Sequence, residues 1–345
     1  MSMRTLMRNP ALARACRACG SDLSSWPTRL ALLAAFVATM APSLEAAEFP
    51  ERPLRLIVPS APGGSPDINA RLVATELTKQ LGQQVVVDNR PGAGGAIGLD
   101  MIIRSVPDGY TLGYGTSAAL ASNLSVLPKL PYDPLKDLQM IAQLGIQPNL
   151  LGASLAIPIS SVQELIDYAK ANPGRLFFGS SGNGTSMHLT GELLKLMTGT
   201  QMVHVPYKAA QQAISDIIGG QVHFMFDNMG SIIGHVRGGR VRGLAVTSVK
   251  RWFAIPELPT MAETVPGFEV MVWGSLVFPA GVPKTIVARL NAEVNRALQT
   301  PALKDKFSGI GYEIVGGTPE QLAEFVRAQI AKWADVARRS GAKID

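Results

Sequence analysis

The sequence has few of the residues on which most enzyme chemistry depends. Its 345 residues include two cysteines, Cys16 and Cys19, and both precede an apolar run near the N-terminus. The rest of the chain has no thiol, which excludes a cysteine nucleophile and a disulfide framework there. No pair of histidines has metal-ligand spacing, and H-E-x-x-H is missing. We therefore predict no catalytic residue and no metal; the four histidines are His188, His204, His223 and His235.

Nucleotide and nucleic-acid signatures are also missing. The glycine-rich stretch from Gly92 resembles a dinucleotide fingerprint, but the third glycine would stand at position 97, which is Ile97. No G-x-x-x-x-G-K-[ST] motif occurs, and no cluster of Lys and Arg is interleaved with aromatic residues. ATP, NAD and nucleic acid are therefore not predicted as ligands, and we expect no cofactor.

Residues 1–47 are typical of a secretory signal peptide. A basic stretch precedes the apolar run Leu30–Met40, which is too short to span a bilayer, and small residues follow up to Ala47. The alternative is an uncleaved membrane anchor. This segment holds five arginines against Asp22 and Glu45, a net +3 of the chain's +6, so cleavage would leave 6 − 3 = +3. We expect export to the periplasm through residues 1–47.

The stretch after residue 53 is predicted to form a strand, a tight loop and the start of a helix. Leu54–Val58 is an apolar run, and the prolines and glycines after it end a strand. Ser65 is a candidate N-cap with Pro66 at the first helical position. Free backbone N–H groups at a helix N-terminus bind anions, so we predict an anion site here. The alternative is an ordinary strand-to-helix turn.

Alternating strand and helix patterns continue to the C-terminus. Capping-box patterns begin at Ser161 and Thr318, and glycines such as Gly82 are stop signals for helices. This alternation predicts an α/β fold with parallel sheets and helices on both faces. The units are too many for one compact sheet, so we expect two lobes.

Polar residues gather in the loops where the predicted strands end. These loops are rich in Gly, Ser, Thr and Asn and poor in catalytic residue types. They offer hydrogen-bond donors, which favours binding an anion over reacting with it. Each loop alone could be an ordinary turn; the loops are Ser60–Gly64, Thr116–Ser117, Gly182–Ser186, Tyr207 and Asp227–Asn228.

These motifs, in this order, resemble the Bug proteins, the extracytoplasmic solute receptors of tripartite tricarboxylate transporters. The resemblance covers the whole predicted mature chain. It is carried by Pro59–Gly64 with Asp67, Asp88–Gly95, Pro107–Leu112, Leu130–Pro134, Gly182–Leu189, Val205–Lys208 and the region of Asp227.

The resemblance implies a periplasmic binding protein of type II, in which two α/β lobes enclose a ligand cleft and the chain crosses twice between them. The expected lobes are 48–150 with 270–345, and 151–269. The expected ligand is a small carboxylate: a di- or tricarboxylate, an acidic amino acid or an aromatic acid. The expected partners are the permease subunits of the transporter, and the receptor is expected to be a monomer.

The ligand-binding residues carried over from the resemblance come from both lobes. The sequence departs from the family pattern at Ser60 and Ala61, where an aromatic residue or proline is common, and at Asn228, where Gln is common. The predicted ligand-binding residues are Ser60, Ala61, Gly63, Gly64, Asp67, Thr116, Ser117, Gly184, Thr185, Ser186, Tyr207 and Asp227.

Two other functions stay open at this point. An exported α/β hydrolase could use a serine such as Ser186, and ester or amide turnover would reveal it. A receptor of the same fold could instead signal to a sensor kinase. The residue types do not name the ligand, because hydrogen bonds from backbone groups and water leave little trace in a sequence.

Overall fold

The computed structural model describes residues 49–127 and 130–340, so the predicted signal peptide lies outside the described residues. Ten strands of this part form one mixed sheet. They are β1 (Leu54–Val58), β2 (Val85–Asn89), β3 (Thr111–Thr116), β4 (Leu138–Ala153), β5 (Phe177–Ser180), β6 (Val203–Pro206), β7 (Phe224–Asn228), β8 (Arg242–Val246), β9 (Met271–Pro279) and β10 (Glu313–Gly316).

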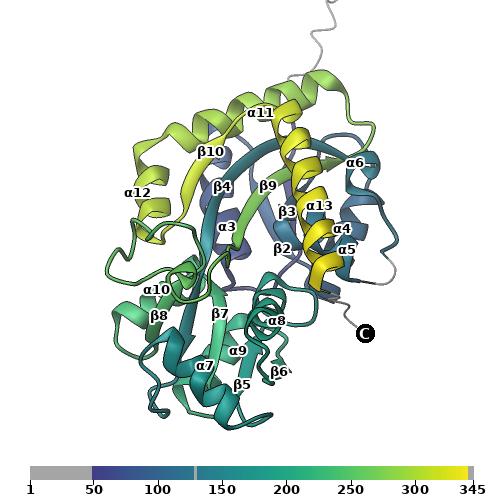
Figure 1. The fold of residues 1–345 in the computed structure, drawn as a ribbon. Coiled ribbons are helices and arrows are strands. Elements are labelled where there is room, and N and C mark those ends of the chain that lie inside the picture. Colours follow the sequence, from purple (N-terminus) through teal and green to yellow (C-terminus); the bar gives the residue numbers. More distant parts are fainter. Residues whose placement is uncertain (1–48, 128–129, 341–345) are drawn as a thin grey trace, which may run out of the picture. The chain divides into compact units, whose positions relative to one another are not determined.

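Helices connect most of the strands and cover the sheet (Figure 1). The α-helices are α3 (Ser65–Leu81), α4 (Ala96–Ile103), α5 (Asn123–Val126), α6 (Pro134–Asp137), α7 (Val162–Ala171), α8 (Ser186–Thr198), α9 (Ala210–Ile218), α10 (Met229–Arg237), α11 (Lys284–Gln299), α12 (Pro301–Gly309) and α13 (Pro319–Ser340). Short helical turns of other types are η3 (Ala93–Gly95), η4 (Ala118–Ser122) and η5 (Met261–Glu263).

The sheet contains two groups of parallel strands joined by antiparallel ones. β1 pairs in parallel with β2 and β3, and β5 pairs in parallel with β6 and β7. Between these groups, β9 is antiparallel to both β3 and β4, and β4 is antiparallel to β7. The predicted parallel pairing is thus confirmed within each group, whereas the antiparallel strands between them were not predicted.

Strand β4 is the longest element that the sequence pattern did not reveal. Figure 1 shows it running from the region of α11 down to β7 and β8. Its residues up to Pro148 pair with β9, and those from Asn149 onward pair with β7. Nearly every residue of β4 is buried, including Gln143 and Gln147, so it shows no alternation of polar and apolar residues. The change of partner after Pro148 lies close to the predicted lobe boundary at 150, which stays a prediction.

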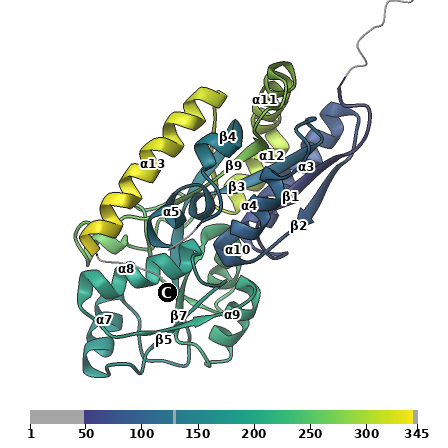
Figure 2. The same ribbon diagram turned by 90° about the vertical axis from the view of Figure 1, so that its right-hand side faces the viewer.

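Both faces of the first strand group are covered by helices. Leu56 and Val58 of β1 lie in a core with side chains of α3 and α11, whereas Ile57 points to a second core that includes Leu322 of α13. Figure 2 shows α13 on one side of these strands and α3 with α11 on the other. The predicted helices on both faces are confirmed here. Within the described residues, no helix is both long and apolar enough to cross a bilayer.

The helix signals in the sequence hold with one exception. Gly82 ends α3 in the left-handed conformation, and Thr318 with Gln321 forms both hydrogen bonds of a capping box. At Ser161 the hydroxyl accepts from Glu164 N, but the Glu164 carboxylate bonds to Ser160. The prediction of Ser65 as an N-cap is wrong. The helix begins at Ser65, and its cap is the preceding glycine, which has no side chain to bond with.

Candidate functional site

A cavity of about 500 Å³ lies where the parallel strands of both groups end. From the first group it is lined by the loops after β1 and β2 and by the end of β3. From the second group come the loops after β5 and β6 and the last residue of β7. Gln147 of β4 and Val272 and Trp273 of β9 complete the wall. Ligands of open α/β sheets commonly bind at the carboxyl ends of strands, so this cavity is the candidate site.

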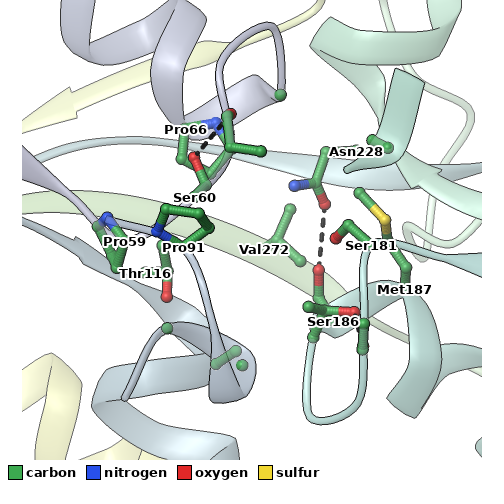
Figure 3. Close-up of a pocket in the computed structure, with 18 of the residues that line it drawn as sticks. Pro59, Ser60, Pro66, Pro91, Thr116, Ser181, Ser186, Met187, Asn228 and Val272 are labelled. Atoms are coloured by element: carbon green, nitrogen blue, oxygen red, sulfur yellow. Dashed lines mark hydrogen bonds between the residues drawn. The ribbon is translucent and has the colours of Figure 1, made fainter. Parts of the chain in front are cut away.

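The cavity wall combines apolar surface with neutral hydrogen-bonding groups (Figure 3). Among its lining residues the single charged side chain is the exposed Lys208, and none is a carboxylate. This chemistry suits an anion with an apolar body. The polar residues that line the cavity are Ser60, Thr116, Ser117, Gln147, Ser181, Asn183, Thr185, Ser186 and Asn228, and the apolar ones include Pro59, Pro66, Pro91, Met187, Val272 and Trp273.

The structure brings most of the predicted site residues together at this cavity. Eight of the twelve line it, from both strand groups; these are Ser60, Ala61, Gly64, Thr116, Ser117, Thr185, Ser186 and Tyr207. The other four, Gly63, Asp67, Gly184 and Asp227, are not among the lining residues.

Asp67 shapes the first loop. Its carboxylate accepts hydrogen bonds from Gly63 N (2.9 Å), Arg71 Nε (2.9 Å) and Asn89 Nδ2 (2.9 Å). Burial raises the pKa of Asp67, but these hydrogen bonds outweigh the burial and hold the pKa below its ordinary value. Asp67 is therefore an ionised group that holds the loop in place.

The expectation of a row of free N–H groups at the start of α3 is wrong for two of its amides. Gly63 N donates to Asp67, and Ser65 N donates to the Ser231 hydroxyl of α10 at 2.9 Å. Pro66 has no N–H group to offer. The N-terminus of α3 is therefore largely satisfied within the protein, and its side chains and backbone mainly give the wall its shape.

The N-terminus of α8 fits the anion-site expectation better. Thr185 is the N-cap residue, and its hydroxyl accepts from His188 N. Ser186 and Met187 occupy the first two helical positions, where backbone N–H groups have no acceptor within the helix. Both residues line the cavity. The positive end of α8 is thus presented to whatever the cavity holds.

Two histidines lie behind this helix start. The rings of His188 and His204 stack with centroids 3.9 Å apart, and His188 Nδ1 accepts from Gly184 N at 3.2 Å. Burial lowers the pKa of His188, and burial together with His188 and Lys195 lowers the pKa of His204 to about 3. Both rings are therefore neutral at physiological pH and support the loop. No group of three His, Cys, Asp or Glu side chains in the described part of the chain could hold a metal ion.

Tyr207 has its hydroxyl group engaged outside the cavity. The hydroxyl donates to Asp216 Oδ2 at 2.6 Å, while the backbone N of Tyr207 donates to Ser180 O. Burial and the Asp216 carboxylate raise the pKa of Tyr207 to about 12. The phenol is thus neutral, and Tyr207 contributes surface to the cavity without a free hydroxyl proton.

Two contacts between the strand groups close the cavity at its edges. On one side, Gln211 Nε2 of α9 donates to Gly63 O at 2.9 Å. On the other, the backbones of Gly94 and Gly184 meet so closely that a Cβ atom on Gly94 would lie 2.9 Å from the Gly184 carbonyl. Asn123 Nδ2 also donates to Gly94 O at 3.0 Å. The Gln211–Gly63 and Gly94–Gly184 contacts thus join the two strand groups at the edges of the cavity.

Sequence reasoning missed several residues of the site. Gln147 lies on β4, which was not predicted as a strand, and Trp273 belongs to no motif that the sequence analysis identified. Lys208 ends the Val205–Lys208 motif but was not among the predicted site residues. The loop Pro91–Gly95 was recognised as glycine-rich but was not assigned to the site. Its positive-φ glycines, which include Gly92, Gly94 and Gly95, were the available signal for a close backbone approach.

Comparison with known proteins agrees with this geometry. A model of the tripartite tricarboxylate transporter family receptor matches residues 69–341. The chain is 40% identical over 319 residues to protein BugT of Bordetella pertussis, which covers 91% of this chain and 98% of BugT.

Solved structures give the same result. A Rhodopseudomonas palustris protein, Rpa4515 with adipate, has a TM-score of 0.83 and 38% identity and covers 86% of this chain and 100% of its own. MatC from the same organism, solved with bound malate, has a TM-score of 0.80 and 32% identity, with coverage of 84% and 99%.

Periplasmic binding proteins are also among the solved structures that this chain resembles. The α/β fold described above is the type II fold of those proteins. Receptors of this kind bind solutes for transport and are not enzymes. The chain belongs to the tripartite tricarboxylate transporter receptor family, to which the Bug proteins also belong.

Proposed function

We propose that this protein captures a small carboxylate in the periplasm and delivers it to the permease subunits of a tripartite tricarboxylate transporter. The observation that carries the proposal is the cavity at the strand ends, with neutral donors on its wall, one lysine and no carboxylate. Because the cavity wall has no acidic side chain, no negative charge on the wall repels an anionic ligand. The N-terminus of α8, whose first two residues line the cavity, adds a positive potential.

We infer that a dicarboxylate with an apolar spacer fits best. The apolar part of the wall, which includes Met187, Val272 and Trp273, would contact the spacer. The relatives solved with adipate and with malate support this class of ligand. Export through residues 1–47 and the lobe division at 150 and 270 belong to the same proposal.

A thermal-shift screen tests the function. The mature protein, residues 48–345, is melted with adipate, malate, citrate, acidic amino acids and aromatic acids. A ligand at a hundred times its dissociation constant adds about 2.7 kcal/mol, and the melting temperature of a chain this long should rise by about 5 °C. Mass spectrometry of the denatured protein shows whether a ligand was purified with it. If no acid raises the melting temperature and the purified protein carries no ligand, the proposal is contradicted.

The contact between Gly94 and Gly184 gives a prediction about closure. In Gly94→Ala, the new Cβ would lie 2.8 Å from Asn123 Nδ2 and 2.9 Å from the Gly184 carbonyl, so the two strand groups could not meet as they do here. Such overpacking costs about 1–3 kcal/mol, so affinity for the acid found in the screen should fall about 10- to 100-fold. Isothermal titration calorimetry measures the loss.

Gly199→Ala is the matched control. Gly199 has φ +64, nearly the same as Gly94 at +62, but no atom lies within 4 Å of its added Cβ. The control variant carries the same backbone strain without the clash, so it should be less stable yet bind normally. Equal affinities of the two variants would show that the Gly94 contact has no part in closure.

A further inference from the structure

Asn228 stands at the start of a helix but does not cap it with its side chain, as an asparagine at this position usually does. It is the last residue of β7 and the N-cap residue of α10, yet its side chain makes no capping hydrogen bond. An N-cap asparagine normally accepts from the backbone N–H of the second or third helical residue. Here the N–H of Gly230 donates to Gln147 Oε1 at 3.1 Å instead. The amide of Asn228 is thus free for another purpose.

The side chain of Asn228 is held in a definite orientation. Ser186 Oγ donates to its Oδ1 at 3.2 Å, and its backbone N donates to Asp227 Oδ1 at 2.7 Å. The residue is 8% exposed and lines the cavity. Figure 3 shows the amide nitrogen turned away from Ser186, toward the side of the cavity that carries Ser60. Among the described residues, the hydrogen bond that Oδ1 accepts from Ser186 is the one bond of this side-chain amide.

A donor that faces the cavity and has no acceptor within the described protein is available to a bound ligand. An amide nitrogen can only donate, so its ligand partner must be an acceptor, and a carboxylate oxygen is the strongest acceptor that the proposed ligands carry. The side chain beneath it, Asp227, is fully buried, and burial raises its pKa to about 8, which removes a negative charge that would otherwise repel the anion.

We propose that Asn228 is a specificity-determining residue, whose Nδ2 donates to a carboxylate oxygen of the ligand while the Ser186 hydroxyl holds the amide in place. This assignment rests on the proposed function and names a residue that selects for it. Asn228 thereby favours a carboxylate over a weaker acceptor, such as the oxygen of an amide, at this end of the ligand.

Replacing Asn228 with aspartate tests the assignment, because the shape is kept while the donor becomes a charged acceptor. The probes are adipate and its half-amide, measured by calorimetry at pH 7, where Asp227 is mostly protonated. Wild-type protein should prefer adipate. N228D should bind adipate about 100-fold more weakly, and its preference should invert in favour of the half-amide, whose amide can donate to the new carboxylate.

Gln201→Glu is the matched control, because Gln201 is exposed outside the cavity and this variant adds the same charge. Q201E should lose less than about 3-fold and keep the wild-type preference, because exposed charges are screened. N228A removes the donor without adding charge. It should weaken adipate binding about 10-fold, which keeps the test decisive if N228D does not fold.

Three results would overturn the assignment. Undiminished adipate binding by N228A would show that the amide does not contact the ligand. An equal loss in N228D and Q201E, without an inverted preference, would mean that the added charge alone weakens binding. Wild-type protein that binds neither probe would instead contradict the proposed dicarboxylate ligand, and the assignment with it.

Discussion

Replacing Gly64 with phenylalanine should abolish carboxylate binding and leave the fold intact. Gly64 has φ −74 and ψ 160, a conformation open to any residue. An added Cβ would meet only Ala61 O at 3.5 Å and Pro66 Cδ at 3.8 Å, which are ordinary contacts. Since Gly64 lines the cavity, the ring would occupy space that the ligand needs. Calorimetry should detect no binding, a loss of about 1,000-fold or more, or roughly 4 kcal/mol.

The free G64F protein should remain folded. An N-cap glycine replaced by an apolar residue costs about 1 kcal/mol, so its melting temperature should fall by no more than about 4 °C. Gly234→Phe is the control, because Gly234 is exposed on α10 and its Cβ would meet nothing within 4 Å. It carries the same bulk outside the cavity and should bind normally. If G64F binds the ligand with wild-type affinity, the loop after β1 is not part of the binding site.

Replacing Asp227 with asparagine should change how stability depends on pH. Asp227 is fully buried, and burial raises its pKa to about 8 from an ordinary 3.8. Between these two values the folded protein holds a proton that the unfolded chain has released. The free energy of unfolding of the wild type therefore falls as pH rises through this range, by up to about 1.4 kcal/mol per pH unit. Below pH 3.8 this stabilising contribution is fully present.

The D227N variant has no proton to lose at this position, and its side-chain oxygen can still accept from Asn228 N. Its stability relative to wild type should therefore rise by several kcal/mol between pH 4 and pH 8. Urea unfolding at intervals of one pH unit measures the difference. Asp305→Asn is the control, because Asp305 is exposed. The difference in free energy of unfolding between this variant and wild type should not change with pH. If the stability difference between D227N and wild type also does not change with pH, Asp227 is ionised in the folded protein.

The loops of the site could be predicted because turn residues leave strong signals. Prolines and glycines end β1 at Pro59, and parallel strands that end together bring their loops to one edge. This is why Ser60, Thr116 and Ser186, far apart in the chain, meet at one cavity. By contrast, β4 escaped prediction because it is buried on both faces and carries buried glutamines and a proline, so neither its period nor its composition indicates a strand.

The roles of the acidic residues could not be predicted from the sequence. Asp67 and Asp227 were predicted as ligand-binding residues from the resemblance to the Bug proteins. In the structure, Asp67 is engaged by Gly63, Arg71 and Asn89, and Asp227 lies wholly beneath the wall. A sequence gives the position of a carboxyl group along the chain but not the direction in which it points. Asn228 was counted in a donor-rich loop but not among the site residues, because the sequence does not show where its amide points.

A crystal structure with the acid that raises the melting temperature most would test the central claim directly. We predict one ligand molecule in the cavity between the loops after β1 and β5, with a carboxylate within hydrogen-bond distance of Asn228 Nδ2 and the start of α8. A ligand bound outside this cavity, or a carboxylate turned away from both groups, would contradict the account.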